Sequence, residues 1–310
     1  MRNLSLKNKT GLTEEQFLEK YKHEYHGAPA NTVDMLLFTI DENPVEDVRK
    51  LPEKELKVLL IKRGDHPFMG CWAIPGGFIN TYESISEAVY RELKEETNID
   101  NVYMEQLYTW GDDVNRDPRM RVISISYMAL VDKTNIKPKA GDRAQEVSWF
   151  SIKKEFVSTY YDNDDKQRVN EYIIRFTSDD GNCIIEYIIK EKYIKKGVST
   201  FKEFEYVPMT RNTDEFAFDH IKIIDAGLER LKNKIEYTPI AFNLLPKYFT
   251  LTELQKVYEV ILNKKLLRAN FRRKVAPMVI ETEYMSHSGG HRPARYYMFN
   301  ENWEHSYFEE

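Results

Sequence analysis

One segment of this sequence constrains the fold more than any other: a helix, expected to begin near Ile85, that carries carboxylates on its apolar side. Ser84 and Glu87 have the spacing of a capping box, which marks the start of the helix. The apolar stripe consists of Ile85, Ala88, Val89 and Leu93. Glu92 and Glu96 fall within about 20° of the centre of that stripe. Because an unpaired charge on a buried face is costly, we expect a cation to meet these carboxylates.

The same helix offers three oxygen ligands that can converge on one point. Glu95 lies about 60° to one side of Glu92 and can still reach the ion that Glu92 and Glu96 would face. Mg²⁺ and Mn²⁺ prefer carboxylate oxygens and bridge to substrate phosphates. The alternative, that this acidic run is an ordinary solvated surface, leaves the two inward carboxylates unexplained. We therefore predict a Mg²⁺ or Mn²⁺ site at which one carboxylate can also activate a water molecule.

The run from Gly77 to Ile99 resembles the Nudix box, a motif defined by glycine, glutamate and arginine positions. It meets every fixed position of the motif except the last glycine, where this chain has Asn98. That glycine would end the helix in the left-handed conformation, and Asn is the next-best residue there. We therefore expect the substitution to leave both the helix end and the activity in place.

Nudix proteins cleave nucleoside diphosphates linked to another moiety and use Mg²⁺ held by this helix. The resemblance implies that Glu92, Glu95 and Glu96 bind the metal, and that Glu92 and Glu95 take part in catalysis, with Glu92 the candidate general base. It also implies that Arg91, paired with Glu83, belongs to the catalytic set and orients the carboxylates. Water would attack a phosphorus atom while the metal neutralises the developing charge.

Outside the box, most candidate site residues rest on residue chemistry alone. Arg63, Arg119 and Arg121 are candidates for binding the pyrophosphate, since arginine suits bidentate phosphate recognition, the alternative being ordinary surface arginines. The resemblance also implies the carbonyl of Gly76 or Gly77 as a candidate metal ligand. The carboxylate of Glu146 is a further candidate, although a hairpin-edge charge is the plainer interpretation of it. Three aromatic residues are candidates for stacking on a nucleobase, with core positions as the alternative: Trp72, Tyr108 and Trp110.

The surrounding pattern predicts an α/β fold, which the resemblance specifies as a Nudix α/β/α sandwich with a mixed sheet. The expected strands cover Thr32–Ile40, Leu56–Ile61, Val122–Val131 and Glu146–Phe150. From about Tyr160 to Pro208, strand-like runs are separated by two hairpin signals, Asp179-Asp180-Gly181 and Lys195-Lys196-Gly197. We expect an inserted β-meander there, followed by a helix from about Asp214 to Lys234.

The C-terminal part differs in charge from the rest of the chain. Residues 247–299 carry a net charge of +6, residues 300–310 carry −4, and the whole chain carries −5. Thr250 and Glu253 cap a helix, a short basic helix follows over 268–275, and two strand-like runs complete a winged helix-turn-helix pattern. The candidate DNA-binding residues on the second helix are Arg268, Arg272, Arg273 and Lys274. The alternative is a packing module whose charges are merely solvated.

This C-terminal unit resembles that of NrtR-type proteins, as do residues 117–124 and 236–242. The resemblance implies a Nudix domain over 1–235 with an insertion at about 160–208, a winged helix over 236–300 and an acidic tail over 301–310. Some members are regulators that sense ADP-ribose or a sugar, and others resemble ADP-ribose pyrophosphatases. A homodimer is expected because a winged helix that reads half-sites benefits from two-fold symmetry.

Two functions follow, and both remain open at this point. The nearly intact box favours a Mg²⁺-dependent hydrolase that cleaves the pyrophosphate of ADP-ribose or a related nucleoside diphosphate sugar. The alternative is a repressor that uses the Nudix domain as an ADP-ribose or sugar sensor and binds double-stranded DNA through the winged helix. No apolar run approaches the roughly 20 residues that span a bilayer. With only two cysteines and no secretory signal, we expect a cytoplasmic protein without membrane partners.

Overall fold

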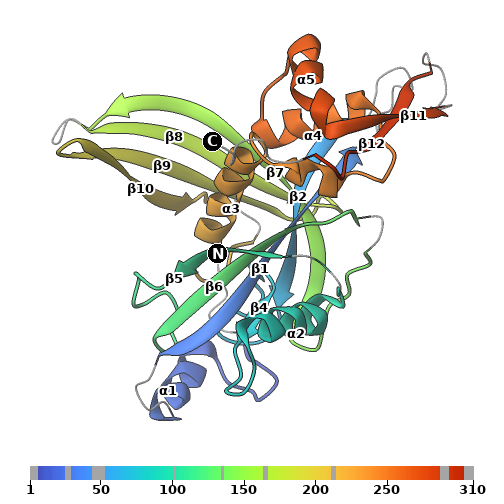
Figure 1. The fold of residues 1–310 in the computed structure, drawn as a ribbon. Helices are drawn as coiled ribbons and strands as arrows, with labels where there is room; N and C mark the ends of the chain where they lie inside the picture. The colour runs from blue at the N-terminus through green and yellow to red at the C-terminus, as the bar shows by residue number, and fades with distance from the viewer. Residues whose placement is uncertain are drawn as a thin grey trace. The chain divides into compact units, whose positions relative to one another are not determined.

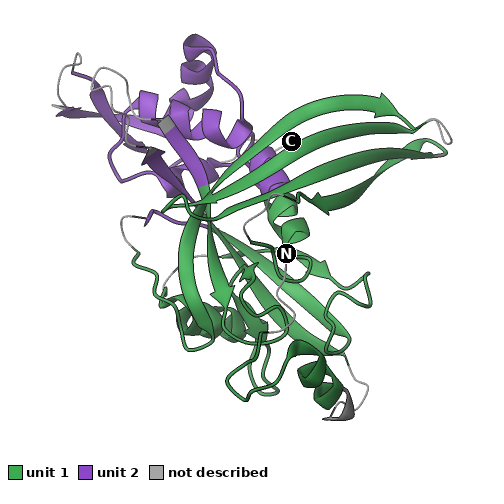
Figure 2. Ribbon diagram, turned by 180° about the vertical axis from the view of Figure 1, so that it is seen from behind, with its two compact units in different colours: residues 1–38, 57–129, 136–227 green, residues 39–56, 130–135, 228–310 purple. Residues whose placement is uncertain are grey.

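The computed structural model of the chain describes residues 6–24, 29–43, 53–100, 102, 104–133, 136–162, 167–210, 214–286 and 293–303. The chain divides into two compact units (Figure 2). The first comprises residues 1–38, 57–129 and 136–227, and the second comprises residues 39–56, 130–135 and 228–310. The carboxylate helix lies in the first unit and the basic helix in the second.

A large sheet organises the first unit (Figure 1). Its strands are β1 (Ala30–Asn43), β2 (Glu53–Arg63), β3 (Trp72–Ala73), β4 (Gly76–Phe78), β5 (Glu105–Trp110), β6 (Val122–Leu130), β7 (Ala144–Tyr161), β8 (Arg168–Ser178), β9 (Ile184–Lys196) and β10 (Ser199–Pro208). Their order is β10-β9-β8-β7-β2-β1-β6-β5, with β3 beside β2 and β4 beside β1. Antiparallel ladders predominate, while Trp72 and Phe216 form a parallel bridge. The predicted α/β fold with a mixed sheet is confirmed.

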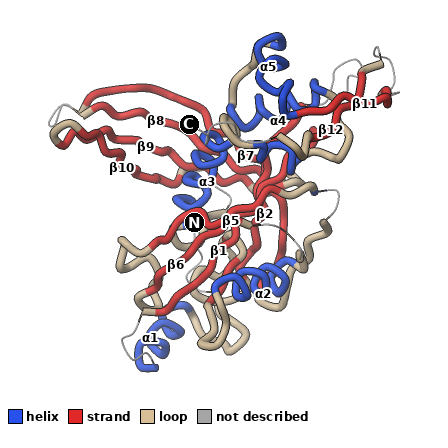
Figure 3. Tube along the Cα trace, in the orientation of Figure 1, coloured by secondary structure: helices blue, strands red, loops and turns tan. Residues whose placement is uncertain are grey.

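The β-meander is present, but it continues the large sheet instead of forming a separate insertion. Strand β7 extends well past the predicted end at Phe150, so that residues 144–151 pair with β2 and residues 150–161 pair with β8. Strands β8, β9 and β10 then follow as long hairpins (Figure 3). Both predicted turns are confirmed, with Gly181 and Gly197 at φ angles of 73° and 63°, a region that favours glycine.

Helices α1 (Glu14–Glu24), α2 (Ile85–Thr97) and α3 (His220–Lys234) accompany this sheet. Helix α2 contacts β4, and in α3 the bare backbone of Gly227 approaches Leu36 and Phe38 of β1. The prediction that α3 begins near Asp214 was wrong. Residues 215–217 instead run beside Trp72, whose backbone N–H donates to the carbonyl of Glu215 at 2.9 Å.

The second unit has the predicted winged-helix elements. They are the 3-10 helix η2 (Pro239–Leu244), α4 (Leu251–Leu262), α5 (Arg268–Val275), the 3-10 turn η3 (Ala276–Met278), β11 (Val279–Met285) and β12 (Arg295–Phe299). Thr250 and Glu253 form the expected capping box of α4. Tyr258 of α4 packs edge-on against Phe271 of α5, with ring centroids 5.2 Å apart. Within the described ranges, no helix is long and apolar enough to cross a membrane.

Candidate functional site

Helix α2 carries its carboxylates as predicted. Glu92 and Glu96 are 1% and 4% exposed, whereas Glu95 is half-exposed. Helix α2 begins with the Ser84–Glu87 capping box and ends at Asn98, whose φ of 57° is the left-handed conformation expected there. Ile85 does not belong to the buried stripe, because at the first turn of the helix it is 40% exposed.

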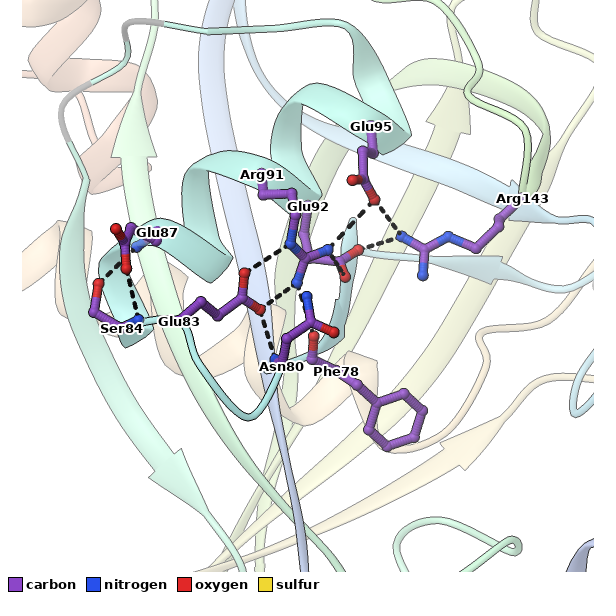
Figure 4. Close-up of polar contacts among 9 residues, drawn as sticks. All are labelled: Phe78, Asn80, Glu83, Ser84, Glu87, Arg91, Glu92, Glu95 and Arg143. Atoms are coloured by element: carbon purple, nitrogen blue, oxygen red, sulfur yellow. Dashed lines mark hydrogen bonds and ion pairs between the residues drawn. The ribbon is translucent and has the colours of Figure 1, made fainter.

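Arg91 organises one side of the carboxylate group (Figure 4). Its Nε donates to Glu83 at 2.8 Å, and its Nη1 donates to Glu92 at 2.6 Å. Its Nη2 reaches the carbonyl of Phe78 at 3.0 Å. The hydrogen bonds from Arg91 and from the backbone of Asn80 lower the pKa of Glu83 to about 2. The Arg91–Glu83 pairing implied by the resemblance is therefore present, and it holds the carboxylate of Glu92 from one side.

A second arginine, which the sequence did not indicate, completes the group. The guanidinium of Arg143 contacts Glu92 and lies 3.5 Å from Glu95 Oε2 (Figure 4). It also lies 3.2 Å from Glu96 Oε1. Arg143 comes from the segment before β7, which docks on the end of α2 through a bond from the Gly141 N–H to the Glu96 carbonyl. A Cβ at Gly141 would stand 1.7 Å from the Glu95 carbonyl, so only glycine allows this approach.

The three carboxylates thus all contact the guanidinium of Arg143, while Arg91 also contacts Glu92 and Glu95. In the described part of the chain, no three acidic, histidine or cysteine side chains are grouped so as to hold a metal ion as they stand. Yet Glu96 Oε2 is buried and lacks a hydrogen-bond partner among the described residues. Burial, with help from the negative charge of Glu92 and against the attraction of Arg143, raises the pKa of Glu96 to about 7. This oxygen-rich set fits a divalent cation if Arg143 gives way.

Beside the carboxylates, the first unit contains a cavity of about 200 Å³. Glu96, Arg143 and Gly76 line it, together with the predicted Arg63 and Arg119. Arg63 donates to the carbonyl of Pro67 at 2.8 Å, and burial and the nearby charge of Arg119 lower its pKa to about 10. Two guanidinium groups that repel each other at the wall of a cavity favour an anionic ligand between them.

The other predicted residues lie elsewhere. Arg121 is not part of the cavity wall, because its guanidinium turns to the carbonyls of Gly111 and Asp113. Glu146 is exposed, lies opposite Lys62 in the β2–β7 ladder and does not line the cavity. Of the two alternatives considered for Trp72, the core position is confirmed, because the residue is 1% exposed. Tyr108 and Trp110 pack edge-on against each other and also lie outside the cavity wall.

The cavity also has polar and aromatic residues that no sequence motif indicated. Arg116 donates to both carboxylate oxygens of Asp219, at 2.7 and 3.1 Å. His220 accepts a hydrogen bond from the Ile74 N–H at 3.1 Å, and burial lowers its pKa. The ring of Phe218 lies 5.0 Å from the Arg63 guanidinium. Arg116 comes from the segment between β5 and β6, whereas Phe218, Asp219 and His220 precede or begin α3, so only the folded chain brings them to the carboxylates.

The basic helix of the second unit presents its charges outward. Phe271 and Val275 are buried against the rest of the unit. The four predicted DNA-binding side chains are all exposed: Arg268, Arg272, Arg273 and Lys274. Among the described residues none of the three arginines forms an ion pair, while Lys274 lies 5.6 Å from the centre of the Tyr258 ring. Helix α5 therefore offers an uncompensated positive surface.

Two protein-family models match this chain. The NUDIX domain model matches residues 47–172, and the model of the NrtR DNA-binding winged helix domain matches residues 241–299. An ADP-ribose pyrophosphatase of Methanocaldococcus jannaschii is 40% identical over 119 residues, which cover 38% of this chain and 69% of that protein. This chain belongs to the Nudix family.

Similarity also extends along nearly the whole of this Nudix protein. The ADPR responsive transcriptional repressor NtrR of Acinetobacter baylyi is 29% identical over 290 residues, or 93% of this chain and 88% of that protein. The crystal structure of Shewanella oneidensis NrtR complexed with a 27mer DNA is 29% identical, with a TM-score of 0.52 and coverage of 87% and 93% of the two chains. This Nudix protein therefore combines a Nudix domain with an NrtR-type winged helix.

The contacts of Arg143 predict how this Nudix protein responds to a metal. Replacing Arg143 with alanine is expected to tighten Mn²⁺ binding about tenfold, because the guanidinium no longer competes for the three carboxylates. Without metal, the variant should lose about 1–2 kcal/mol of unfolding free energy, since Arg143 is half-exposed and its ion pairs are partly screened. Calorimetry with Mn²⁺ and thermal unfolding in EDTA measure the two effects.

A matched variant of the same segment is Lys139→Ala, because Lys139 is exposed and contacts α2 through its backbone N–H. This variant should leave both the Mn²⁺ affinity and the unfolding free energy unchanged. Equal or weaker Mn²⁺ binding by Arg143→Ala would show that the guanidinium and the metal do not compete.

The pKa of Glu96 predicts a pH dependence of metal binding. Burial raises this pKa to about 7, so near neutral pH the carboxyl is often protonated, and a metal must displace the proton. Mn²⁺ affinity should therefore rise about tenfold from about pH 6 to about pH 8 and level off above. Titration of Glu96→Gln should show weaker binding without that rise. An equally steep rise in Glu96→Gln would assign the proton to another group.

Proposed function

We propose that this protein is a DNA-binding regulator whose Nudix domain recognises ADP-ribose or a related nucleoside diphosphate sugar. The observation that carries the proposal is the combination, in one chain, of a cavity lined by guanidinium groups and a winged helix with an uncompensated basic helix. The similarity to an ADPR responsive repressor over 93% of the chain supports it. The ligand would control the affinity of the protein for its operator.

Recognition of DNA would use α5 as the helix that enters the major groove. Arg268, Arg272 and Arg273 are the exposed candidates for base and phosphate contacts, with Lys274 beside them. Because such helices usually read two related half-sites, we also propose a homodimer. Light scattering of the full chain would measure its mass in solution, and a monomer mass at DNA-binding concentrations would contradict the dimer.

Recognition of the ligand would use the cavity of the first unit. Arg63 and Arg119, which line this cavity, would bind the pyrophosphate, and Arg119 forms a two-bond pair with Asp117. Calorimetric titration of the full chain with ADP-ribose in EDTA tests this step apart from hydrolysis. Saturable binding of one ligand per chain is expected. Absence of heat at high protein concentration, together with an unchanged melting temperature, would contradict the proposal.

A second function, hydrolysis of the same ligand, is favoured by the complete set of carboxylates on α2. Glu92, Glu95 and Glu96 would hold Mg²⁺ or Mn²⁺, and the metal would polarise the pyrophosphate and lower the pKa of a bound water. Glu92 or Glu95 would accept the proton of the attacking water. Arg91, anchored by Glu83, would keep Glu92 in place. The products from ADP-ribose would be AMP and ribose phosphate.

Hydrolysis is tested with a panel of nucleoside diphosphate sugars in Mg²⁺ or Mn²⁺, followed by chromatography of the products. Metal-dependent release of AMP from ADP-ribose is the expected result. Binding without turnover in either metal would leave this chain a regulator and remove the hydrolase function.

A further inference from the structure

His66 is a buried histidine without a hydrogen-bond partner at the wall of the ligand cavity. The residue is 6% exposed, and neither ring nitrogen has a partner among the described residues. Most buried polar side chains in folded proteins do have such partners, and a buried polar group left unpaired costs stability. His66 lines the same cavity as Arg63, Arg119 and Glu96. Its ring nitrogens therefore have unused hydrogen-bonding capacity beside this cavity.

The local fold holds His66 in this position. The residue lies in the turn between β2 and β3, three residues after Arg63. Phe17 of α1 covers the imidazole, with ring centroids 5.9 Å apart. Glu14 at the start of α1 accepts a hydrogen bond from the N–H of Phe68 at 3.3 Å, so α1 is attached to this turn at two points. The imidazole is buried by packing and not by a polar contact.

A second histidine in the same cavity shows the contrast. His220 is 5% exposed, but its Nδ1 accepts a hydrogen bond from the Ile74 N–H at 3.1 Å. The imidazole of His220 thus has a role in joining α3 to the strand region before β4. No comparable bond to His66 exists in the described part of the chain. Two histidines of similar burial therefore differ in what they contribute to the fold.

The chemistry of a neutral imidazole indicates its partner. One ring nitrogen donates a hydrogen bond and the other accepts one, a combination that suits hydroxyl groups, which also do both. Phosphate oxygens accept only, and the cavity already provides guanidinium groups for them. Building on the function proposed above, we propose that His66 hydrogen-bonds a sugar hydroxyl of the nucleoside diphosphate sugar and so contributes to its selection.

The test compares His66→Leu with the wild-type full chain, because leucine is of similar size and forms no hydrogen bond. In EDTA and without ligand, the melting temperature of His66→Leu should equal or exceed that of the wild type. Calorimetry should show ADP-ribose binding weakened about tenfold, the loss of roughly one hydrogen-bonded contact. His66→Gln, which keeps a donor and an acceptor, should recover part of the affinity. If the imidazole of His66 instead stabilised the fold, the melting temperature of His66→Leu would be lower than that of the wild type.

His220→Leu is the matched control, since it removes an imidazole of the same cavity that does have a backbone partner. It should lower the ligand-free melting temperature. Unchanged ADP-ribose affinity in His66→Leu, or a melting temperature lowered as in His220→Leu, would overturn the proposed role of His66. If the wild type itself fails to bind ADP-ribose, the proposed function fails first. The melting temperatures then still decide whether the imidazole is unpaired.

Discussion

Replacing Arg272 and Arg273 with alanine is expected to weaken binding to duplex DNA about 100-fold at moderate salt. Both side chains are exposed on α5, and neither has an acidic partner among the described residues, so their charge is available to phosphates and base edges. The slope of log affinity against log salt should fall by about 1.8 if both contact phosphates. Fluorescence anisotropy with a duplex selected from a random pool by the wild-type chain measures both quantities.

The control for this variant removes the same charge from the C-terminal part of α3, residues 228–234, which belongs to the second unit. Lys232 and Lys234 lie in the last turn of α3, and their double alanine variant should bind the selected duplex nearly as well as the wild type. Comparable losses in the two double variants would mean that only net charge matters. Full affinity in the Arg272/Arg273 variant would exclude α5 as the reading helix.

Changing Glu95 and Glu96 to glutamine is expected to lower metal-dependent cleavage of ADP-ribose by about 1000-fold or more. The change removes two of the three carboxylates that converge on Arg143 and would hold the metal. Binding of ADP-ribose in EDTA should persist, because the guanidinium groups of Arg63 and Arg119 remain. Product analysis in Mg²⁺ and calorimetry in EDTA separate the two effects.

Glu87→Gln provides the matched control on the same helix. Glu87 is exposed and its carboxylate accepts the Ser84 N–H at 2.7 Å, a role that glutamine can also fill. This variant should keep full turnover. If Glu95→Gln/Glu96→Gln cleaves ADP-ribose as fast as Glu87→Gln does, the carboxylates of α2 do not hold a catalytic metal.

The parts of the site that could be predicted from the sequence are those set by local geometry. Helical periodicity placed Glu92 and Glu96 on the buried side, and capping rules located both ends of α2, including the left-handed Asn98. The winged-helix elements followed from the same local signals. The prediction that Ile85 is buried was wrong for a local reason: Ile85 lies in the first turn of α2, where its side chain faces solvent.

The parts that could not be predicted depend on contacts between distant segments. Arg143 reaches Glu92 across 51 positions in the chain, and no periodicity or motif links the two. The cavity histidines are likewise brought together by tertiary packing, one from the turn after β2 and one from the start of α3. The predicted start of α3 was wrong because residues 215–217 form backbone hydrogen bonds with Trp72 instead of helical ones.

The most direct test of the account is whether ADP-ribose changes the affinity of the full chain for DNA. Anisotropy titrations of the selected duplex would be run in EDTA, with and without saturating ADP-ribose, so that no ligand is cleaved. A coupling typical of ligand-controlled proteins predicts that ADP-ribose weakens DNA binding, with a dissociation constant about tenfold larger when ADP-ribose is present. An identical dissociation constant, with calorimetry showing that the cavity is occupied, would contradict the proposal that this Nudix domain controls the winged helix.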